Sequence, residues 1–184
     1  MNIHDTTIKA IESARADYDE DISHLSPGGR PLYAPDIMAA KTAAIRAAYL
    51  AEIARLEDRA RTALTAAERK LADGRGDPYQ WLSDDELRRA NLLAPFVKED
   101  IERGAATAPT GDRARAWLLW RAAAAGGESG AAELERAAWP DDLHAADETI
   151  TLARAALSAV DMAHPDFTAG VLARYGIQSY SQPA

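Results

Sequence analysis

Residues 36–73 of this 184-residue chain read DIMAAKTAAIRAAYLAEIARLEDRARTALTAAERKLAD, a stretch without proline or glycine. Ala, Leu, Arg and Glu, all strong helix formers, supply most of it, so the sequence predicts one helix of about 57 Å at 1.5 Å per residue. Apolar side chains recur along it at alternating intervals of four and three residues, the repeat that keeps a narrow seam facing a partner helix. This predicted seam consists of Tyr49, Ile53, Leu56, Ala60, Ala63 and Ala67.

The composition indicates a helical chain with a thin core. Alanine occurs 42 times, whereas Leu, Ile, Val and Phe together number only 32. Alanine lets two helices approach closely but buries little area, so the stabilisation of roughly 25 cal/mol per Å² must come from the few larger apolar side chains. Packing against another chain would increase the buried area. We therefore expect the seam to be covered by a protein partner or by self-association.

Charge and targeting signals exclude several classes of function. The formal net charge is −8, and residues 77–184 carry 17 acidic against 10 basic side chains, so this half should repel nucleic acid. The chain has no Cys, and its first residues lack the apolar run of a signal peptide. Its most apolar segment, residues 114–125, is too short to cross a membrane. We expect neither nucleic-acid nor membrane binding.

The pattern predicts an all-α fold, in which residues 1–76 form a long, coiled-coil-like helical hairpin. Its first helix runs from Asp5, a plausible N-cap, toward Ile22, and a Pro- and Gly-rich turn at 26–31 follows. The long helix then begins after Pro35, with Asp36 as its cap. Antiparallel pairing of the two helices buries both apolar stripes without a third element.

A smaller cluster of helices is predicted for residues 77–176, after the boundary at Gly74–Pro78. Ser83 and Glu86 form a capping-box pattern, so a helix should begin at Asp84, and Pro95 should bend it before it ends near Glu102. A linker over 104–111 precedes the remaining helices, which are predicted at 112–125, 131–138, 141–163 and 165–176. Residues 177–184 should be a loose tail.

The best metal-like cluster is His144, Asp147 and Glu148, which share one helical face. A convincing metal site needs a second group of ligands elsewhere, and the sequence supplies none. Acidic side chains also suit the start of a helix, which favours a solvated surface. The acidic run at 17–21 lacks the Gly and the distal Glu of a calcium loop. We predict no metal and no cofactor.

Other candidate sites also have simpler interpretations. Gly28-Gly29 lacks the preceding strand of a phosphate loop and is best interpreted as a turn. Trp117 and Trp120 have the three-residue spacing of core side chains, although they also suit a ligand pocket or base stacking. Ser, Thr and His occur without a nucleophile elbow or a triad-like neighbourhood. The sequence therefore predicts no enzyme and no catalytic residues.

Four short motifs resemble a known group of proteins. They are Leu25-Ser26-Pro27-Gly28-Gly29-Arg30, Ala48-Tyr49-Leu50-Ala51-Glu52-Ile53, Trp81-Leu82-Ser83-Asp84-Asp85-Glu86-Leu87 and Ala94-Pro95-Phe96-Val97-Lys98-Glu99-Asp100. Their order over residues 5–103 is similar to that in small helical proteins encoded among the virion-assembly genes of tailed bacteriophages. The resemblance implies a head-assembly or virion-associated role, with capsid or portal components as partners. It also implies a location in the host cytoplasm or in the virion.

The leading hypothesis is thus a non-enzymatic helical protein of phage head assembly or of the virion, which binds partners through the long helix. The alternative is a ligand-binding or regulatory helical module with a pocket near Trp117 and Trp120. A pocket with convergent polar groups beside these tryptophans would favour the alternative. An exposed seam on the long helix would favour the leading hypothesis.

Overall fold

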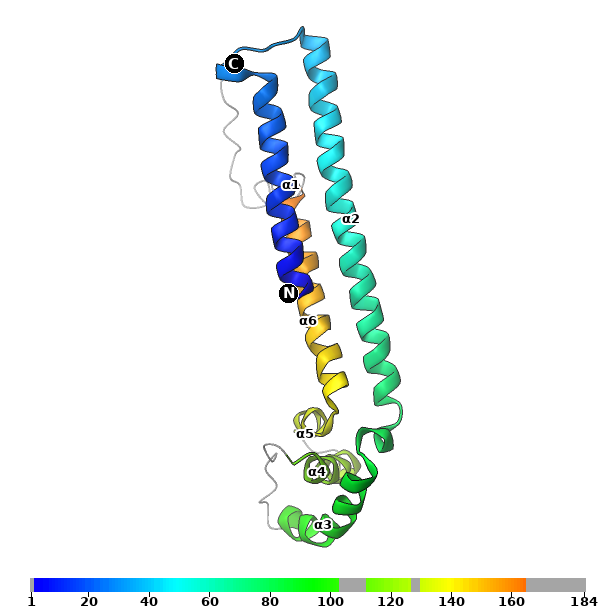
Figure 1. The fold of residues 1–184 in the computed structure, drawn as a ribbon. Helices are drawn as coiled ribbons and strands as arrows, with labels where there is room; N and C mark the ends of the chain where they lie inside the picture. The colour runs from blue at the N-terminus through cyan, green and yellow to red at the C-terminus, as the bar shows by residue number, and fades with distance from the viewer. Residues whose placement is uncertain (1, 103–111, 127–129, 165–184) are drawn as a thin grey trace. The chain divides into compact units, whose positions relative to one another are not determined.

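The computed structural model describes residues 2–102, 112–126 and 130–164, with the side chains of 98–102 excepted. Every regular element in these residues is helical, which confirms the predicted all-α fold and its N-terminal hairpin (Figure 1). The elements are α1 (Ile3–Leu25), the 3₁₀ turn η1 (Pro27–Gly29), α2 (Pro35–Arg75), the 3₁₀ turn η2 (Pro78–Trp81), α3 (Asp84–Glu102), α4 (Arg113–Gly126), α5 (Ala131–Ala138) and α6 (Asp141–Ala163).

The chain forms two compact units whose limits differ from the predicted boundary near residue 76. Of the described residues, unit 1 combines 2–66 with 149–164, and unit 2 contains 67–102, 112–126 and 130–148. Helix α2 contributes its first part to unit 1 and its last turns to unit 2, and α6 contributes to both in the reverse order. The difference arises because the second half of α6 packs with the hairpin, a contact between segments far apart in the sequence.

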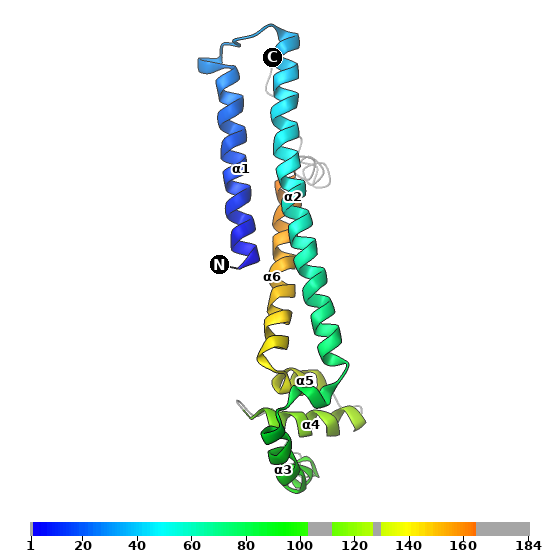
Figure 2. The same cartoon turned by 45° about the vertical axis from the view of Figure 1, so that its right-hand side comes forward.

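In unit 1, α1 and α2 are antiparallel, and the second half of α6 lies along them (Figures 1 and 2). Ile53 and Leu56 of α2 form one buried cluster with Val160 of α6, and Ile11 of α1 packs against it. The rings of Tyr18 and Tyr49 join α1 to α2, with centroids 5.3 Å apart. Along the part of the hairpin that α6 contacts, unit 1 therefore has a core made of three helices.

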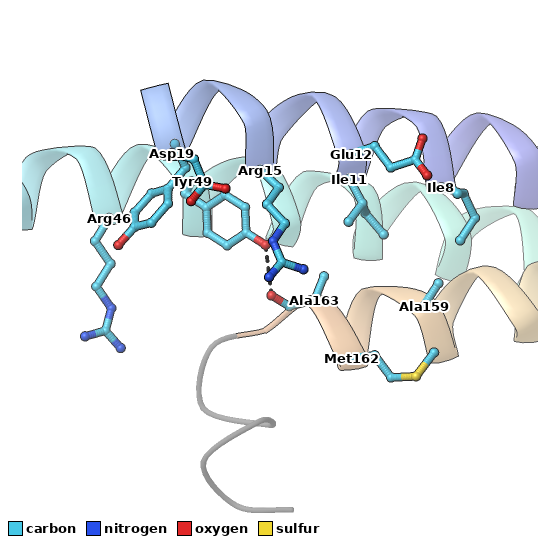
Figure 3. A pocket seen from close by; sticks show the side chains of 11 residues that line it. Ile8, Ile11, Glu12, Arg15, Asp19, Arg46, Tyr49, Ala159, Met162 and Ala163 are labelled. Atoms are coloured by element: carbon cyan, nitrogen blue, oxygen red, sulfur yellow. Dashed lines mark hydrogen bonds between the residues drawn. The ribbon is translucent and has the colours of Figure 1, made fainter. Parts of the chain in front are cut away.

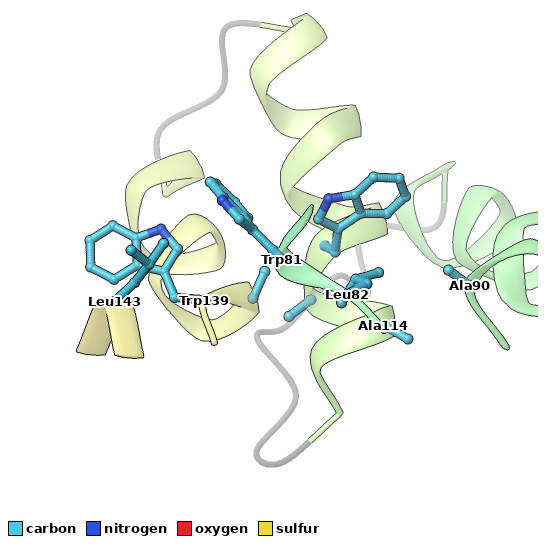
Figure 4. Close-up of a cluster of buried hydrophobic side chains, with 9 residues drawn as sticks. Trp81, Leu82, Ala90, Ala114, Trp139 and Leu143 are labelled. Atoms are coloured by element: carbon cyan, nitrogen blue, oxygen red, sulfur yellow. The ribbon is translucent and has the colours of Figure 1, made fainter. Parts of the chain in front are cut away.

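The core of unit 2 is organised around tryptophans (Figure 4). The indole Nε1 of Trp81 donates a hydrogen bond of 2.7 Å to the carbonyl of Gly74, and that of Trp117 donates one of 2.9 Å to the carbonyl of Pro78. Both polar atoms are thus satisfied inside an apolar environment, which favours one arrangement of the core. The buried cluster contains Trp81, Leu82, Ala90, Ala114, Ala116, Trp117, Ala138, Trp139 and Leu143.

The predicted capping box forms at the start of α3. The backbone N–H and the hydroxyl of Ser83 each donate a hydrogen bond of 2.9 Å to Glu86 Oε2, and the Glu86 N–H donates one of 3.4 Å to Ser83 Oγ. Burial alone would raise the pKa of Glu86, but these bonds and the nearby Arg113 hold it below its usual value. The carboxylate is therefore charged at neutral pH and fixes the first turn of α3.

Several predicted boundaries are confirmed and others are corrected. Helices α5 and α6 have the predicted limits, 131–138 and 141–163. The N-cap of α1 is Asn2, whose side chain accepts from the Asp5 N–H, so Asp5 is not the cap. Helix α2 begins one residue earlier than expected, at Pro35, because proline suits the first helical position. Most of the predicted linker, the helix at 165–176 and the tail at 177–184 lie outside the described residues.

Candidate functional site

The predicted interface seam on α2 is an internal surface of the folded chain. Ile53 and Leu56 are each 2% exposed and Ala60 is fully buried. Ala67 is also buried, whereas Tyr49 and Ala63 are half-buried. The four-three repeat therefore identified a packed face correctly, but the structure does not leave it free for a partner.

Unit 1 contains an open groove of about 650 Å³ at the C-terminal end of α6 (Figure 3). Its apolar wall comes from α1 and α6, and its polar side chains come from α1 and α2. Met162, which is 57% exposed, lies at its edge. The lining residues are Ile8, Ile11, Glu12, Arg15, Tyr18, Asp19, Arg46, Tyr49, Ala159, Met162 and Ala163.

Charges of both signs line this groove. Glu12, Arg15 and Asp19 follow one another on α1 at intervals of three and four residues, so they share one face of the helix. Arg46 of α2 adds a second cation. Among the described residues, no ion pair joins Arg15 to either Glu12 or Asp19. The groove therefore presents a balanced set of two cations and two carboxylates.

Tyr49 closes one end of the groove. Its hydroxyl donates a hydrogen bond of 2.9 Å to the carbonyl of Ala163, which belongs to the last turn of α6 (Figure 3). Burial raises the pKa of the Tyr49 phenol; Arg15 opposes this effect, and Asp19 adds to it. The phenol is thus protonated at neutral pH, as this bond requires. It satisfies one of the terminal carbonyls that a helix leaves without an internal partner.

Unit 2 carries an exposed apolar pair on α3. Leu92 is 75% exposed and Phe96 is 65% exposed. These residues are four apart, so they lie next to each other on the helix, while Ala90 and Val97 are buried on its opposite side. Helix α3 is therefore apolar on both sides at its middle, and only one of these sides packs against other residues that the structure describes. Arg88 and Asp85 are exposed on the same outer side, one and two turns earlier.

Trp117 and Trp120 occupy the core of unit 2. Trp117 is buried, and Trp120 packs against the same cluster with its ring 4.9 Å from that of Trp81. The Arg121 guanidinium lies 4.7 Å from the centre of the Trp117 ring. These contacts agree with the core interpretation of the spacing. The alternative pocket beside the two tryptophans therefore has no support from the described contacts.

The metal-like candidates are surface side chains of α6 and α1. His144 and Glu148 are exposed, and Asp147 accepts a hydrogen bond from Arg136. The acidic residues at 17–21 are also exposed. In the part of the chain that the structure describes, no three His, Asp or Glu side chains are arranged to hold a metal ion. The turn interpretation of Gly28-Gly29 agrees with η1, where both glycines have positive φ angles of 62° and 77°.

Comparison with known proteins gives no relative on which to base a function. No protein-family model matches the chain, and neither a curated protein nor a solved structure matches it. Within residues 2–102, 112–126 and 130–164, no helix combines the length and the apolar character that are needed to cross a bilayer.

The sequence predictions did not include the groove or the α3 surface. The groove depends on where α6 ends beside α1 and α2, which no local pattern encodes. A signal for the α3 surface was present, because Leu92 and Phe96 fall on the side of the helix opposite Ala90 and Val97. An amphipathic helix has one apolar side, so the second side marks a candidate contact surface.

Proposed function

We propose that this protein is a non-enzymatic helical interaction protein of phage head assembly or of the virion, and that it binds a partner protein through the outer side of α3. The observation that carries the proposal is the exposed pair Leu92 and Phe96. Burying either side chain fully contributes about 1.5 to 3 kcal/mol, which a partner would supply on binding. This surface replaces the seam on α2 as the proposed contact.

The chemistry of this surface suits an apolar groove on the partner. Side chains at i and i+4 are the anchors with which a helix enters a hydrophobic groove. Arg88 and Asp85 are exposed next to the apolar pair and would lie at the rim, where charges set orientation more than affinity. The resemblance of residues 5–103 to phage virion-assembly proteins supports capsid or portal proteins as the partners. It likewise supports a place in the host cytoplasm or in the virion.

A binding titration with purified coat and portal proteins of the same phage tests the proposal. We expect one of them to bind the wild-type chain, and the double variant Leu92→Ser/Phe96→Ser to raise the Kd at least about 30-fold, because truncating one anchor residue typically costs at least about 2 kcal/mol. The double variant Leu32→Ser/Tyr33→Ser is a matched control, since it removes two exposed apolar side chains from unit 1.

Two results would overturn the proposal. The first is the absence of binding of the wild-type chain to either protein at 100 µM, a concentration about 100 times the Kd of a 1 µM complex. The second is equal binding by the α3 variant and the wild-type chain. Counting complete particles by electron microscopy after infection with phage that carry the α3 variant gives an independent readout, and we expect fewer of them.

A further inference from the structure

Unit 2 has an aromatic corner, formed by Tyr79 of η2 with Trp117 and Arg121 of α4. The two rings pack edge to face, with centroids 5.6 Å apart and planes at 66°. The Arg121 guanidinium lies 4.7 Å from the centre of the Trp117 ring and 5.2 Å from that of Tyr79. Trp117 is buried, whereas Tyr79 is 56% exposed and Arg121 is exposed. The aromatic corner therefore presents a phenol and a guanidinium at the surface.

Hydrogen bonds hold the aromatic corner in place. The Trp117 indole Nε1 donates a bond of 2.9 Å to the Pro78 carbonyl, which ties its ring to η2. Asp77 caps η2 by accepting a bond of 3.1 Å from the Tyr79 N–H. A guanidinium that stacks on aromatic faces is pre-organised, so Arg121 gives up less side-chain freedom when it binds a ligand.

The two polar groups of the aromatic corner have no acceptor in the part of the chain that the structure describes. There, neither the Arg121 guanidinium nor the Tyr79 hydroxyl makes a hydrogen bond or an ion pair. The rings cover the faces of the guanidinium, so its N–H groups remain available at its edge. Planar N–H donors of this kind match the two oxygens of a carboxylate.

Two other arginines of unit 2 indicate which ligand completes such a site. Arg75 and Arg136 also lie near an indole ring, 5.8 and 5.9 Å from the centre of Trp139. Each of them also binds a carboxylate: Arg75 donates bonds of 2.6 and 3.0 Å to Glu135, and Arg136 donates one to Asp147. Among the described residues, the guanidinium of the aromatic corner has the ring contacts without the carboxylate.

We propose that the aromatic corner binds one carboxylate, carried by an Asp or Glu side chain of a partner protein. One guanidinium balances one negative charge, whereas a nucleic acid would be repelled by residues 77–184, which carry 17 acidic against 10 basic side chains. The corner is exposed, so a small carboxylate alone binds weakly and a protein supplies the remaining contact area. Only the identity of that protein, a coat or portal protein, rests on the proposed function.

An NMR titration of the isotope-labelled full chain at constant ionic strength tests the site itself. The probe is the α-amide of N-acetylglutamate, which carries one carboxylate, and the α-amide of N-acetylglutamine is its neutral control. We expect the carboxylate to shift the Arg121 Nε–H signal with a Kd of about 10 to 100 mM, because a single surface pair is weak. The neutral control should cause a shift at least about fivefold smaller.

Arg59 is a matched control in the same spectra. It is an exposed arginine of α2, and no aromatic ring among the described residues contacts it. We expect the Kd at Arg59 to be at least about threefold higher than that at Arg121, because its guanidinium is not pre-organised. Arg121→Lys keeps the charge but loses the planar N–H edge, so the probe should no longer shift the Trp117 Nε1–H signal.

The titration with coat and portal proteins tests the partner. Arg121→Glu should raise the Kd at least about tenfold, because it places like charges opposite one another, whereas Arg59→Glu should leave the Kd unchanged. Circular dichroism checks that both variants keep the helix content of the wild-type chain. If Leu92→Ser/Phe96→Ser weakens binding and Arg121→Glu does not, the inference fails and the proposed function stands. The reverse result supports the aromatic corner and removes the α3 contact.

Three results of the NMR titration would also overturn the inference. Equal Kd values at Arg121 and Arg59 would mean that the rings do not create a site. A lower Kd for inorganic phosphate than for the carboxylate probe would assign the corner to a phosphate ligand. Glu128 lies outside the described residues, and we expect Glu128→Gln to leave the Kd of the probe unchanged. If this variant lowers the Kd at least about threefold, a carboxylate of the same chain occupies the corner.

Discussion

The backbone of Gly74 lies so close to Leu143 that a Cβ atom on residue 74 would be 2.3 Å from Leu143 Cδ2. Leu143 is buried in the core of unit 2 and has little room to move. We therefore expect Gly74→Ala to destabilise the protein by about 1 to 3 kcal/mol, although alanine is the better helix former. Urea unfolding monitored by tryptophan fluorescence measures this change. A gain in stability would show that Leu143 can adopt another rotamer freely.

Removing the Tyr49 hydroxyl should lower the stability of unit 1 by an amount that depends on pH. Tyr49→Phe deletes the hydrogen bond to Ala163 and should cost about 0.5 to 1.5 kcal/mol at pH 8. Burial raises the pKa of Tyr49 above 10.0 in the folded state, so the unfolded chain loses this proton first. The contribution of Tyr49 is complete below pH 10 and declines as the pH rises through the folded-state pKa.

Urea unfolding of the wild-type chain and of Tyr49→Phe between pH 8 and pH 11 checks this sign. The difference between their free energies of unfolding isolates Tyr49 from the other titrating groups, which both proteins share. We expect the difference to shrink as the pH rises above 10. A constant difference across this range would mean that the phenol ionises equally in both states.

The capping box should make the stability of the protein depend on pH in the acidic range. The pKa of Glu86 is lowered in the folded state from its ordinary value of 4.5, so its contribution is present above that pH and is lost as the pH falls through the folded-state pKa. Glu86→Gln keeps a side chain that suits the capping box but removes the charge. We expect this variant to be less stable than the wild-type chain at pH 7, and the difference in stability to shrink as the pH falls through the folded-state pKa of Glu86.

Ser83→Ala is the companion variant for the same helix start. It removes the hydroxyl that bonds to Glu86 and accepts from its N–H, and we expect it to cost about 0.5 to 2 kcal/mol at pH 7. Chemical denaturation measures both variants on one scale. Equal stability of Ser83→Ala and the wild-type chain would indicate that water replaces the hydroxyl without loss.

Ile53→Asp distinguishes an internal seam from an intermolecular one. Because Ile53 is 2% exposed and packs with Leu56 and Val160, an unpaired carboxylate there should unfold unit 1 rather than only dissociate a complex. The milder change Ile53→Ala should cost about 2 to 5 kcal/mol of stability. Thermal unfolding measured by circular dichroism tests both. A folded Ile53→Asp variant with an unchanged melting temperature would contradict the packing described for unit 1.

Local signals in the sequence predicted most of the helices and failed where packing between distant segments decides the outcome. The limits of α5 and α6 could be predicted because Gly130 and Pro140 interrupt the helical pattern beside them. The cap of α1 is Asn2 and not Asp5, a choice that the sequence leaves open because both residue types suit a cap and only the geometry distinguishes them. Caps and breakers act over a few residues, so they leave distant contacts undefined.

The seam shows this limit most clearly. Its four-three repeat indicated correctly that Ile53 and Leu56 face a partner helix, but a periodic pattern does not say which helix that is. The partner in the described structure is α6, which supplies Val160 to the same cluster. The groove was beyond prediction for the same reason, since its position depends on the point at which α6 ends along α2.

The separation of Leu56 and Val160 in the sequence also has a consequence for folding during translation, because Leu56 is synthesised well before its packing partner. About 100 residues must be added after Leu56 before Val160 exists, which takes a ribosome roughly 5 to 20 s at the usual rates of elongation. During this interval the nascent hairpin exposes the apolar side chains that α6 later covers. Unit 1 is thus completed only after α6 has been synthesised, and until then chaperones or neighbouring nascent chains can reach the seam of the nascent chain.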